Sequence, residues 1–419
     1  MPQRKSLFWT LAILLAAACA AAAQEPFALR DGDRVVFFGD SITDQRLYTT
    51  FTETYVVTRF PRTNISLVHS GWGGDRVTGG GGGPMDVRIW RDVLPFNPTV
   101  VTVMLGMNDG RYRAFDQAIF DEFTSGYKHI VDSFKRQLPA ARITLLQPSP
   151  YDDVTRAPMF EGGYNQVLVR YGDFLKQLAA DQKLGLADIN TPVVAALAKA
   201  NAADAVNAAK VIPDRVHPGA AGHLLLAESL LKAWNAPSLV AGTEIDAARK
   251  EAVRQRNTRV ADLRVANKGV AWTQTDEALP MPLDRRDPLV VLVLRSSDFM
   301  ESLNQEPLTV RGLAAGRYTL KIDGEPAGEF TSEQLAQGIN LAELPTPMAR
   351  QAAEVHALTL RHNNVHTARW RQIQVPLEKD RSPQLSKALD ALDDLEADIV
   401  KQQRAAAIPK ARHFELTQE

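Results

Sequence analysis

Four short apolar segments, each followed within two residues by glycine or proline, alternate with amphipathic stretches in the first part of the chain. The apolar segments are residues 34–38, 65–69, 99–105 and 142–146. The helical patterns are residues 116–137, 161–183, 192–209 and 219–234. Near-continuous apolar strands of this length are typical of a parallel sheet buried on both faces. The alternation therefore predicts a layered α/β domain.

The N-terminus has the pattern of a targeting segment. Arg4 and Lys5 are followed by residues 7–23, an uncharged run that ends in Ala21-Ala22-Ala23 before Gln24. A basic start, an apolar stretch and a small-residue cleavage site predict a signal peptide over residues 1–23 and an exported, periplasmic or extracellular, mature chain. An uncleaved anchor is the first alternative. A lipid anchor at Cys19 is the second, and Ala16, three residues earlier, disfavours it because a large aliphatic residue is preferred there.

Composition excludes several classes of protein. The chain has 419 residues, of which 45% are hydrophobic and 23% charged, as in an ordinary soluble globular protein. The formal net charge of −1 gives no field that attracts nucleic acid or anionic lipid, so neither is expected as a partner. The single cysteine, Cys19, lies in the predicted signal peptide, which rules out a disulfide framework and a cysteine-ligated metal site in the mature chain.

The sequence pattern changes after Pro237, which divides the mature chain into residues 24–236 and 237–419. In the second part, residues 244–264 carry a thin apolar stripe that indicates a helix. The segments that read as strands are residues 289–294, 308–313, 317–322 and 327–330. Residues 383–400 have leucines at helical spacing and predict a helix that packs on 244–264. The tail beyond Pro409 is expected to be loose, and the whole region is predicted to be a small β-rich module flanked by helices.

Four segments with residues suited to catalysis stand at the ends of predicted elements. They are Gly39-Asp40-Ser41-Ile42-Thr43, Gly71-Trp72-Gly73-Gly74-Asp75, Gly106-Met107-Asn108-Asp109 and Asp214-Arg215-Val216-His217-Pro218-Gly219. In open α/β sheets, chemistry gathers in the loops beyond the carboxyl ends of the strands. A local turn or a helix cap explains each segment taken alone. Their joint occurrence in this order is the informative observation.

The residue types in these segments suit acyl transfer. Ser41 stands at a strand-to-helix turn, which raises its hydroxyl above the sheet edge. Asp214 and His217 are three residues apart, so the carboxylate can hold the imidazole while the other ring nitrogen faces the serine. Asn108 can donate a hydrogen bond into the same cleft. A run of five glycines, residues 79–83, lacks the Lys-Ser/Thr ending of a phosphate loop and is interpreted as a mobile loop beside the cleft.

Together the four segments resemble the SGNH, or GDSL-type, esterase and acylhydrolase superfamily, over residues 33–236. The resemblance implies a three-layer α/β/α sandwich with a parallel sheet. It also implies a catalytic triad of Ser41, His217 and Asp214, and an oxyanion hole formed by Ser41, Gly74 and Asn108. No metal or organic cofactor is implied. One departure is His69, which stands where many members carry asparagine before the glycine-rich segment.

The substrate is less constrained than the reaction. The expected function is an exported serine esterase that removes O-acetyl groups from carbohydrate, with an acetylated glycan as the expected partner. Trp72 would either stack on a sugar ring or pack over the glycine turn. A general lipolytic or aryl esterase, or a thioesterase, is the alternative enzyme, and a non-catalytic binding protein is the alternative outside enzymes. The three histidines His356, His362 and His366 lack nearby acidic residues at metal-ligand spacing. Nothing in the sequence indicates the oligomeric state.

Overall fold

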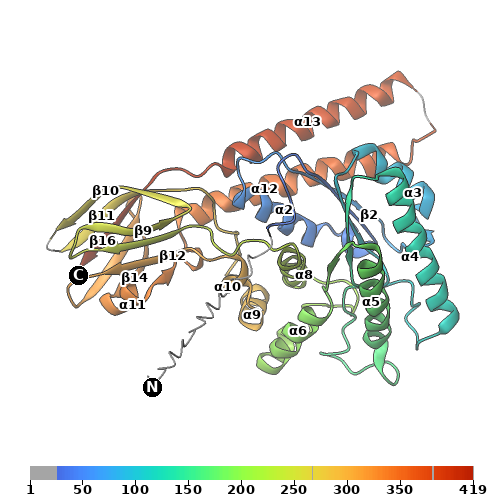
Figure 1. Cartoon of the computed structure of the whole chain (residues 1–419), viewed down its shortest axis with the longest axis horizontal. Helices are drawn as coiled ribbons and strands as arrows, with labels where there is room; N and C mark the ends of the chain where they lie inside the picture. Colours follow the sequence, from blue (N-terminus) through green and yellow to red (C-terminus); the bar gives the residue numbers. More distant parts are fainter. Residues whose placement is uncertain (1–25, 267, 380–381, 419) are drawn as a thin grey trace, which may run out of the picture.

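The chain folds into an α/β part, a β-rich part and a long helical hairpin that joins them (Figure 1). The computed structural model describes residues 26–266, 268–379 and 382–418. The predicted signal peptide, residues 1–23, and Cys19 therefore lie outside the described residues. Within the described residues, every helix is too short or too polar to cross a bilayer.

The α/β part is built on a five-stranded, all-parallel sheet in the order β2-β1-β5-β6-β7. The strands are β1 (Arg34–Gly39), β2 (Ser66–Gly71), β5 (Val100–Met104), β6 (Arg142–Leu146) and β7 (Gly185–Ala187). All five residues of β5 are buried, and so are five of the six in β1, as expected for strands covered on both faces. The predicted apolar segments thus correspond to four of the five strands.

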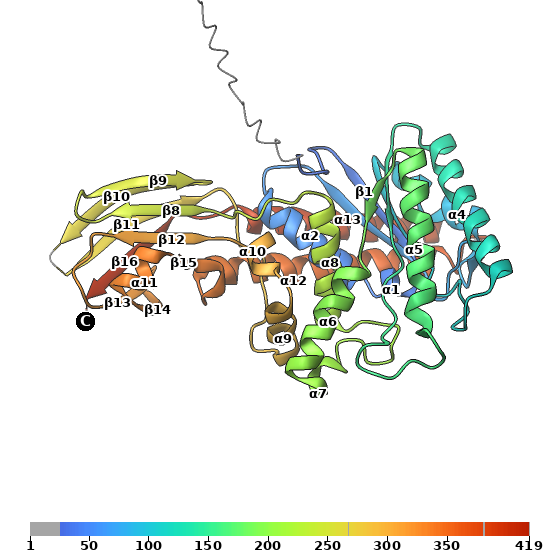
Figure 2. The ribbon, with the colours of Figure 1, turned by 60° about the horizontal axis from the view of Figure 1, so that its bottom comes forward.

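Helices cover both faces of this sheet, which gives the predicted three-layer α/β/α sandwich (Figure 2). One face carries α4 (Gln117–Gln137) and α5 (Gly163–Gln182), and the other carries α2 (Leu47–Arg59) and α8 (Ala220–Ala233). The remaining elements of this part are α1 (Ser41–Asp44), β3 (Gly79–Gly80), β4 (Gly83–Pro84), α3 (Met85–Asp92), the 3₁₀ turn Leu94–Phe96, α6 (Thr191–Ala203) and α7 (Ala205–Ala208).

Local sequence explains where the long helices start. Asp116 caps α4 by accepting the backbone N–H groups of Ala118 and Ile119. A buried face then follows at helical spacing, including Phe123, Tyr127 and Phe134.

The β-rich part contains two sheets around a second apolar core. The five-stranded antiparallel sheet has the order β10-β11-β16-β13-β14, and the four-stranded sheet has the order β15-β12-β8-β9. The strands are β8 (Gly242–Asp246), β9 (Glu251–Arg256), β10 (Thr258–Ala266), β11 (Gly269–Asp276), β12 (Pro307–Arg311), β13 (Arg317–Ile322), β14 (Glu325–Thr331), β15 (Ile339–Asn340) and β16 (Arg412–Gln418). Helix α11 (Ser332–Gln337) and the 3₁₀ turn Leu341–Glu343 complete it. Helices α9 (Pro288–Ser296) and α10 (Phe299–Leu303), although they lie in the second half of the sequence, pack against α6 and α8 of the α/β part.

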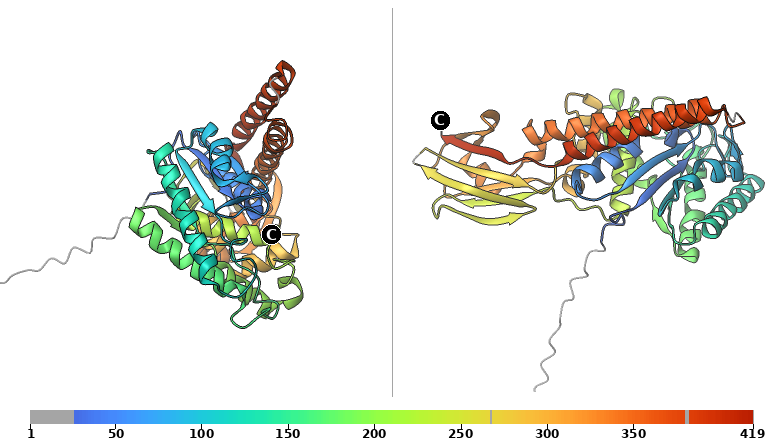
Figure 3. Two further views of the ribbon diagram at one scale, coloured as in Figure 1. Left: turned by 90° about the vertical axis from the view of Figure 1, so that its right-hand side faces the viewer. Right: turned by 90° about the horizontal axis from the view of Figure 1, so that it is seen from above.

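A helical hairpin carries the chain back onto the α/β part. Helix α12 (Pro347–Thr367) leaves the β-rich part, packs along α2 and continues into a π-helical turn, η3 (Ala368–Gln374). Helix α13 (Pro383–Ala407) returns antiparallel to α12, as the view from above shows (Figure 3). The chain then ends in β16, a central strand of the five-stranded sheet.

Four predictions for the second part are wrong. Residues 244–264 form β8, β9 and most of β10 rather than a helix. A β-bulge between Ala261 and Arg264 places Val260 and Leu263 on the same inward face of the strand. Because these two apolar residues are three positions apart, the sequence pattern looks like that of a helix. Helix α13 consequently packs on α12 instead of on 244–264. The tail beyond Pro409 is an interior strand, because Phe414 and Leu416 alternate into the second core.

The segment 289–294, predicted as a strand, is the helix α9. Asp287 accepts the backbone N–H of Leu289, and Pro288 occupies the first turn. The periodicity of a short apolar run fits a strand or a helix equally well, and here the N-terminal cap favours the helix.

Candidate active site

Ser41 stands directly after the first strand, at the carboxyl edge of the parallel sheet. It is the first residue of α1, and the carboxylate of Asp40 caps that helix by accepting the N–H of Ile42 at 3.0 Å. Asp40 is fully buried, and burial raises the pKa of its carboxyl group to about 7. The sharp strand-to-helix turn leaves the Ser41 side chain half-buried at the surface of the edge.

His217 hydrogen-bonds both Ser41 and Asp214. Its Nε2 atom lies 2.8 Å from Oγ of Ser41, and its Nδ1 atom lies 2.7 Å from Oδ2 of Asp214. The other carboxylate oxygen of Asp214 accepts the backbone N–H groups of Val216 and His217. Burial alone would raise the pKa of Asp214, but these hydrogen bonds outweigh it and hold the pKa below its ordinary value. The carboxylate is therefore ionised and fixes the imidazole.

A loop after β6 holds the Asp214–His217 turn in place. Arg156 donates to the carbonyls of Ala209, Ile212 and Pro213, just before Asp214. It is itself held by the buried carboxylate of Asp152.

Arg215 ties the same turn to this loop from the other side. It has a left-handed backbone, with φ of +72°, and donates to the carbonyl of Ala157. Such a conformation in a non-glycine residue costs free energy and is concentrated at functional sites.

The glycine-rich segment after β2 lies against the turn that carries Ser41. The N–H of Trp72 donates to the carbonyl of Gly39, and the N–H of Gly73 donates to Oδ2 of Asp44, the last residue of α1. Gly74 follows with φ of +75°, a left-handed conformation that favours glycine.

Asn108, at the end of the segment that follows β5, reaches the same loop. Its Nδ2 atom donates to the carbonyl of Asp75 at 3.0 Å, and its Oδ1 atom accepts the hydroxyl of Tyr112 at 2.8 Å. Its neighbour Asp109 is buried and accepts the N–H of Val77. The four predicted segments thus meet at one edge of the sheet.

This arrangement suits nucleophilic chemistry. A serine hydroxyl, an imidazole and an ionised carboxylate form a hydrogen-bonded chain in which the imidazole can take the serine proton. The glycine segment contacts the turn that carries Ser41, and Asn108 contacts the glycine segment. N–H groups near a nucleophile are the groups that stabilise a tetrahedral oxyanion.

Trp72 packs over the glycine turn. It is 9% exposed, with the guanidinium groups of Arg88, Arg91 and Arg371 over its ring and Trp370 against its edge. It therefore has no free face for a sugar, and of the two sequence interpretations the packing one is confirmed.

The five-glycine run is folded onto this cluster. Gly79–Gly80 pairs with Gly83–Pro84 as the antiparallel ladder β3-β4. A Cβ atom at Gly82 would lie 2.4 Å from Cδ of Arg88 and 2.7 Å from the Trp72 ring, so the close approach itself requires glycine.

Several other histidines have structural surroundings. His223 is buried and hydrogen-bonds the backbone N–H of Tyr48 and the side chain of Gln45. His69 bonds Thr49 and faces Glu53, on the face of the sheet that α2 covers. His362 and His366 belong to α12 and face Glu396 on α13. In the part of the chain that the structure describes, no group of three or more His, Cys, Asp or Glu side chains is arranged to hold a metal ion.

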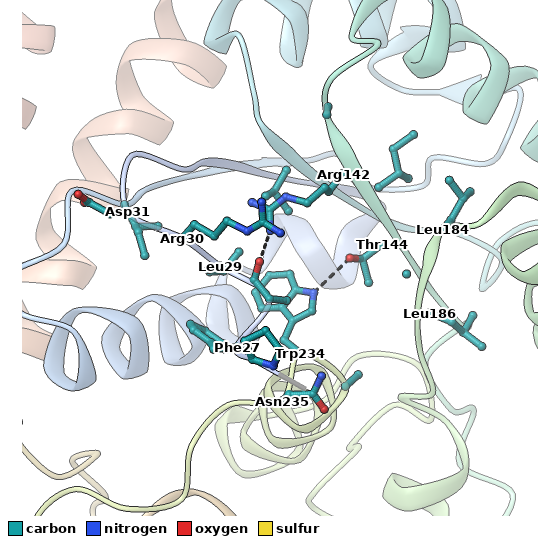
Figure 4. A pocket seen from close by; sticks show the side chains of 18 of the residues that line it. Phe27, Leu29, Arg30, Asp31, Arg142, Thr144, Leu184, Leu186, Trp234 and Asn235 are labelled. Carbon is teal, nitrogen blue, oxygen red and sulfur yellow. Dashed lines mark hydrogen bonds between the residues drawn. The ribbon is translucent and has the colours of Figure 1, made fainter. Parts of the chain in front are cut away.

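A hollow of about 780 Å³ lies at the opposite, amino edge of the sheet (Figure 4). Phe27 and Trp234 line it, and the indole N–H of Trp234 donates to Thr144. None of the four segments contributes to it, so it is separate from the candidate active site.

Comparison with known proteins identifies the α/β part. Residues 37–225 match the model of the GDSL-like lipase/acylhydrolase family, a range that contains all four segments just described. These residues are a GDSL-type, or SGNH, hydrolase domain. The protein is accordingly a serine ester hydrolase.

Relatives cover either this domain or nearly the whole chain. An acetylxylan esterase from Geobacillus stearothermophilus is 25% identical over 224 residues, which is 48% of this chain and 93% of the relative. A solved structure of the acetylxylan esterase from that organism covers 49% of this chain and 96% of its own, with 24% identity and a TM-score of 0.40. A gut microbial diltiazem-metabolizing enzyme matches with a TM-score of 0.82 and 27% identity, over 93% of this chain and 98% of its own. This last match extends beyond the hydrolase domain, so the diltiazem-metabolizing enzyme shares the β-rich part and the helical hairpin as well.

Sequence reasoning missed three residues at the site. Tyr112, Arg156 and Arg371 contact Asn108, the Asp214 turn and Trp72 respectively. None of the three belongs to a motif or a periodic pattern, because each acts through a loop or through a contact between segments far apart in the sequence.

Proposed function

We propose that this GDSL-type enzyme removes O-acetyl groups from carbohydrate, with Ser41, His217 and Asp214 as its catalytic triad. The observation that carries the triad is the hydrogen-bonded chain from Ser41 through His217 to Asp214, with links of 2.8 and 2.7 Å. The acetylated glycan as substrate is supported by similarity of the hydrolase domain to an acetylxylan esterase.

In the proposed reaction, His217 removes the proton of Ser41 while Oγ attacks the ester carbonyl carbon. The negative charge moves to the carbonyl oxygen, and the tetrahedral intermediate collapses when His217 gives its proton to the departing alcohol. Water, deprotonated by His217, then attacks the acyl-enzyme, and the acid leaves as Ser41 recovers its proton. Asp214 stabilises the imidazolium that forms in each half.

The oxyanion hole is proposed to consist of the N–H groups of Ser41 and Gly74 and the side-chain amide of Asn108. The first supporting observation is the left-handed backbone of Gly74 beside the serine turn. The second is the pair of hydrogen bonds that fixes the Asn108 amide, one given to Asp75 and one received from Tyr112. A rigid donor of this kind stabilises charge without having to reorganise during the reaction.

A general esterase of small molecules is the second candidate. It is favoured by the likeness to a gut microbial diltiazem-metabolizing enzyme, which extends through the β-rich part and the helical hairpin. The packed surroundings of Trp72 also remove one predicted sugar-stacking surface.

The two candidates are separated by a substrate panel. Acetate release is measured from acetylated xylan and its oligosaccharides, and p-nitrophenol release from p-nitrophenyl esters of increasing acyl chain length. Turnover of diltiazem is followed beside them. The glycan proposal expects the highest kcat/KM on acetylated oligosaccharides and a steep fall with acyl length. Preference for aryl acetates or diltiazem over every acetylated glycan would replace it with the second candidate.

We also propose that the enzyme is exported after cleavage following Ala23. The support is the basic start, the apolar run and the small residues before Gln24. N-terminal sequencing of protein from the exported fraction should begin at Gln24. A mature chain that retains Met1, or one modified at Cys19, would contradict this.

A further inference from the structure

The C-terminal half of the chain reaches the candidate active site. At the end of the hairpin, η3 lies beside α3, far from the β-rich part (Figure 1). The indole N–H of Trp370 donates to Asp92 at 2.7 Å, and Arg91 faces Glu378 at 3.7 Å. These contacts dock residues 370–378 against the segment that follows the glycine run.

Arg371 extends from η3 over the glycine-rich segment. Its guanidinium group lies on the face of the Trp72 ring, and its Nη2 atom is 3.9 Å from Oδ2 of Asp44. The same Asp44 oxygen accepts the N–H of Gly73 at 3.2 Å. Arg371 thus contacts both ends of the link between α1, which starts at Ser41, and the segment that contains Gly74.

The two neighbouring arginines, Arg88 and Arg91, pair with other groups. Arg88 is fully buried and is committed to Asp75, Asp92 and the carbonyl of Ser70. Arg91 is committed to Asp92 and the carbonyl of Gly82.

Among the residues that the structure describes, Asp44 is the one carboxylate within 4.0 Å of the Arg371 guanidinium, and Asp44 is itself part of the serine turn. Its planar guanidinium covers Trp72 in a way that a lysine cannot reproduce.

We propose that Arg371 is a positioning residue for the esterase reaction, holding Trp72, Gly73 and Gly74 against the Ser41 turn. This role rests on the proposed function of Ser41 and Gly74. Oxyanion donors must be held within about half an ångström of the productive geometry. The β-rich part and the hairpin therefore contribute to catalysis by delivering this side chain.

The test compares Arg371→Ala with Arg369→Ala. Arg369 lies two residues earlier in the same π-helical turn, but it bonds Asp393 and Gln374 within the C-terminal region. Both variants remove a guanidinium group from η3, so a loss of activity that comes only from destabilising η3 should occur in both. If Arg371→Ala does not fold, Arg371→Met, which keeps an unbranched apolar stem over Trp72, takes its place.

The readouts are kcat and KM on p-nitrophenyl acetate and the rate at which a fluorophosphonate probe labels Ser41. Full loss of one oxyanion donor costs about 10²–10³ in kcat. Misalignment should cost less, so Arg371→Ala should lower kcat about tenfold to a hundredfold. KM should stay within twofold and labelling should slow in parallel, while Arg369→Ala keeps the wild-type kcat.

A double variant distinguishes this positioning role from a general contribution of Arg371 to stability. Arg371→Ala and Asn108→Ala act on the same oxyanion hole, so their combined loss in kcat should be smaller than the product of the single losses. Fully multiplicative losses, an equal fall in Arg369→Ala, or a kcat within twofold of the wild type would overturn the role of Arg371. Wild-type protein that is neither labelled nor active on any ester would instead contradict the proposed function, and the role of Arg371 with it.

Discussion

The hydroxyl of Tyr112 donates a hydrogen bond of 2.8 Å to the side-chain oxygen of Asn108. Tyr112 and the preceding Arg111 both have left-handed backbones, with φ of +54° and +55°. Two such residues in succession store strain, which persists only where the surrounding structure holds it. The bond orients the amide so that Oδ1 is occupied and Nδ2 is directed toward the glycine-rich loop.

Tyr112→Phe should therefore lower kcat about tenfold with little change in KM, because only the orientation of the Asn108 amide is lost. Tyr151→Phe is the matched control, since it removes a neighbouring hydroxyl that bonds the sulfur of Met159. Steady-state kinetics on p-nitrophenyl acetate measures both. A rise in KM alone in Tyr112→Phe would make Tyr112 a substrate contact.

Asn108→Ala removes the amide itself and should be more severe. The expected loss is about 10²–10³ in kcat, or roughly 3–4 kcal/mol, with KM nearly unchanged. The reason is that the donor interacts more strongly with the oxyanion than with the neutral carbonyl. Labelling of Ser41 should slow but remain detectable, because Asp214 and His217 are intact. An unchanged kcat would exclude Asn108 from the oxyanion hole.

Truncation after residue 236 should give an unstable protein. The hairpin buries the side chain of Glu53 on α2 beneath His362, Asn363 and Gln403, and Val57 of α2 belongs to the second apolar core. Removing the hairpin exposes the face of α2 that carries both the Glu53 carboxylate and apolar side chains.

We expect the truncated chain to aggregate or to melt well below the full chain in a thermal scan. A stable truncation with the wild-type kcat would show that the hairpin and Arg371 are dispensable.

The Glu53–His362 pair predicts a pH dependence of stability. His362 Nε2 lies 2.5 Å from Glu53, and both side chains are buried. Burial alone would lower the pKa of His362, but the carboxylates of Glu53 and Glu396 outweigh it and raise the pKa to about 10. Because the folded pKa lies above the unfolded value, the stabilisation is complete below about pH 6.5. It is lost as the pH rises through about 10.

His362→Gln should accordingly destabilise the protein by about 3–5 kcal/mol at pH 6, since it leaves the buried Glu53 carboxylate without its cationic partner. The difference in melting temperature between wild type and variant should narrow toward pH 10.5. His356→Gln is the control, because His356 bonds the hydroxyl of Thr54 rather than a carboxylate. A difference that is constant between pH 6 and 10.5 would mean that His362 is neutral in the folded protein.

The sequence predicted the α/β part well because two independent signals agree there. Apolar runs such as residues 99–105 are too continuous for a surface strand, and each is followed within two residues by a glycine or a proline. The site segments follow these strands, so order along the chain translates into a place in the fold. Capping by Asp116 and by Asp40 adds local agreement.

The β-rich part was predicted less well because its local signals conflict. The bulge in β10 mimics helical spacing, and Pro288 after Asp287 turns an apolar run into a helix. The last strand depends on partners far away in sequence: Phe414 pairs with Trp272 and Ile322. The contact of Arg371 with Trp72 spans nearly 300 residues, and such contacts leave no periodicity in a single sequence.

The most direct test of the account is Ser41→Ala, assayed for acetate release beside the wild type. Ser41 is the only hydroxyl that His217 contacts in the described residues, so no second nucleophile is in place. The variant should keep the melting temperature and lose activity by several orders of magnitude. Mass spectrometry should find the fluorophosphonate adduct on the peptide containing Ser41 in the wild type and no adduct in the variant. A Ser41→Ala rate within tenfold of the wild type, or an adduct on another residue, would contradict the account.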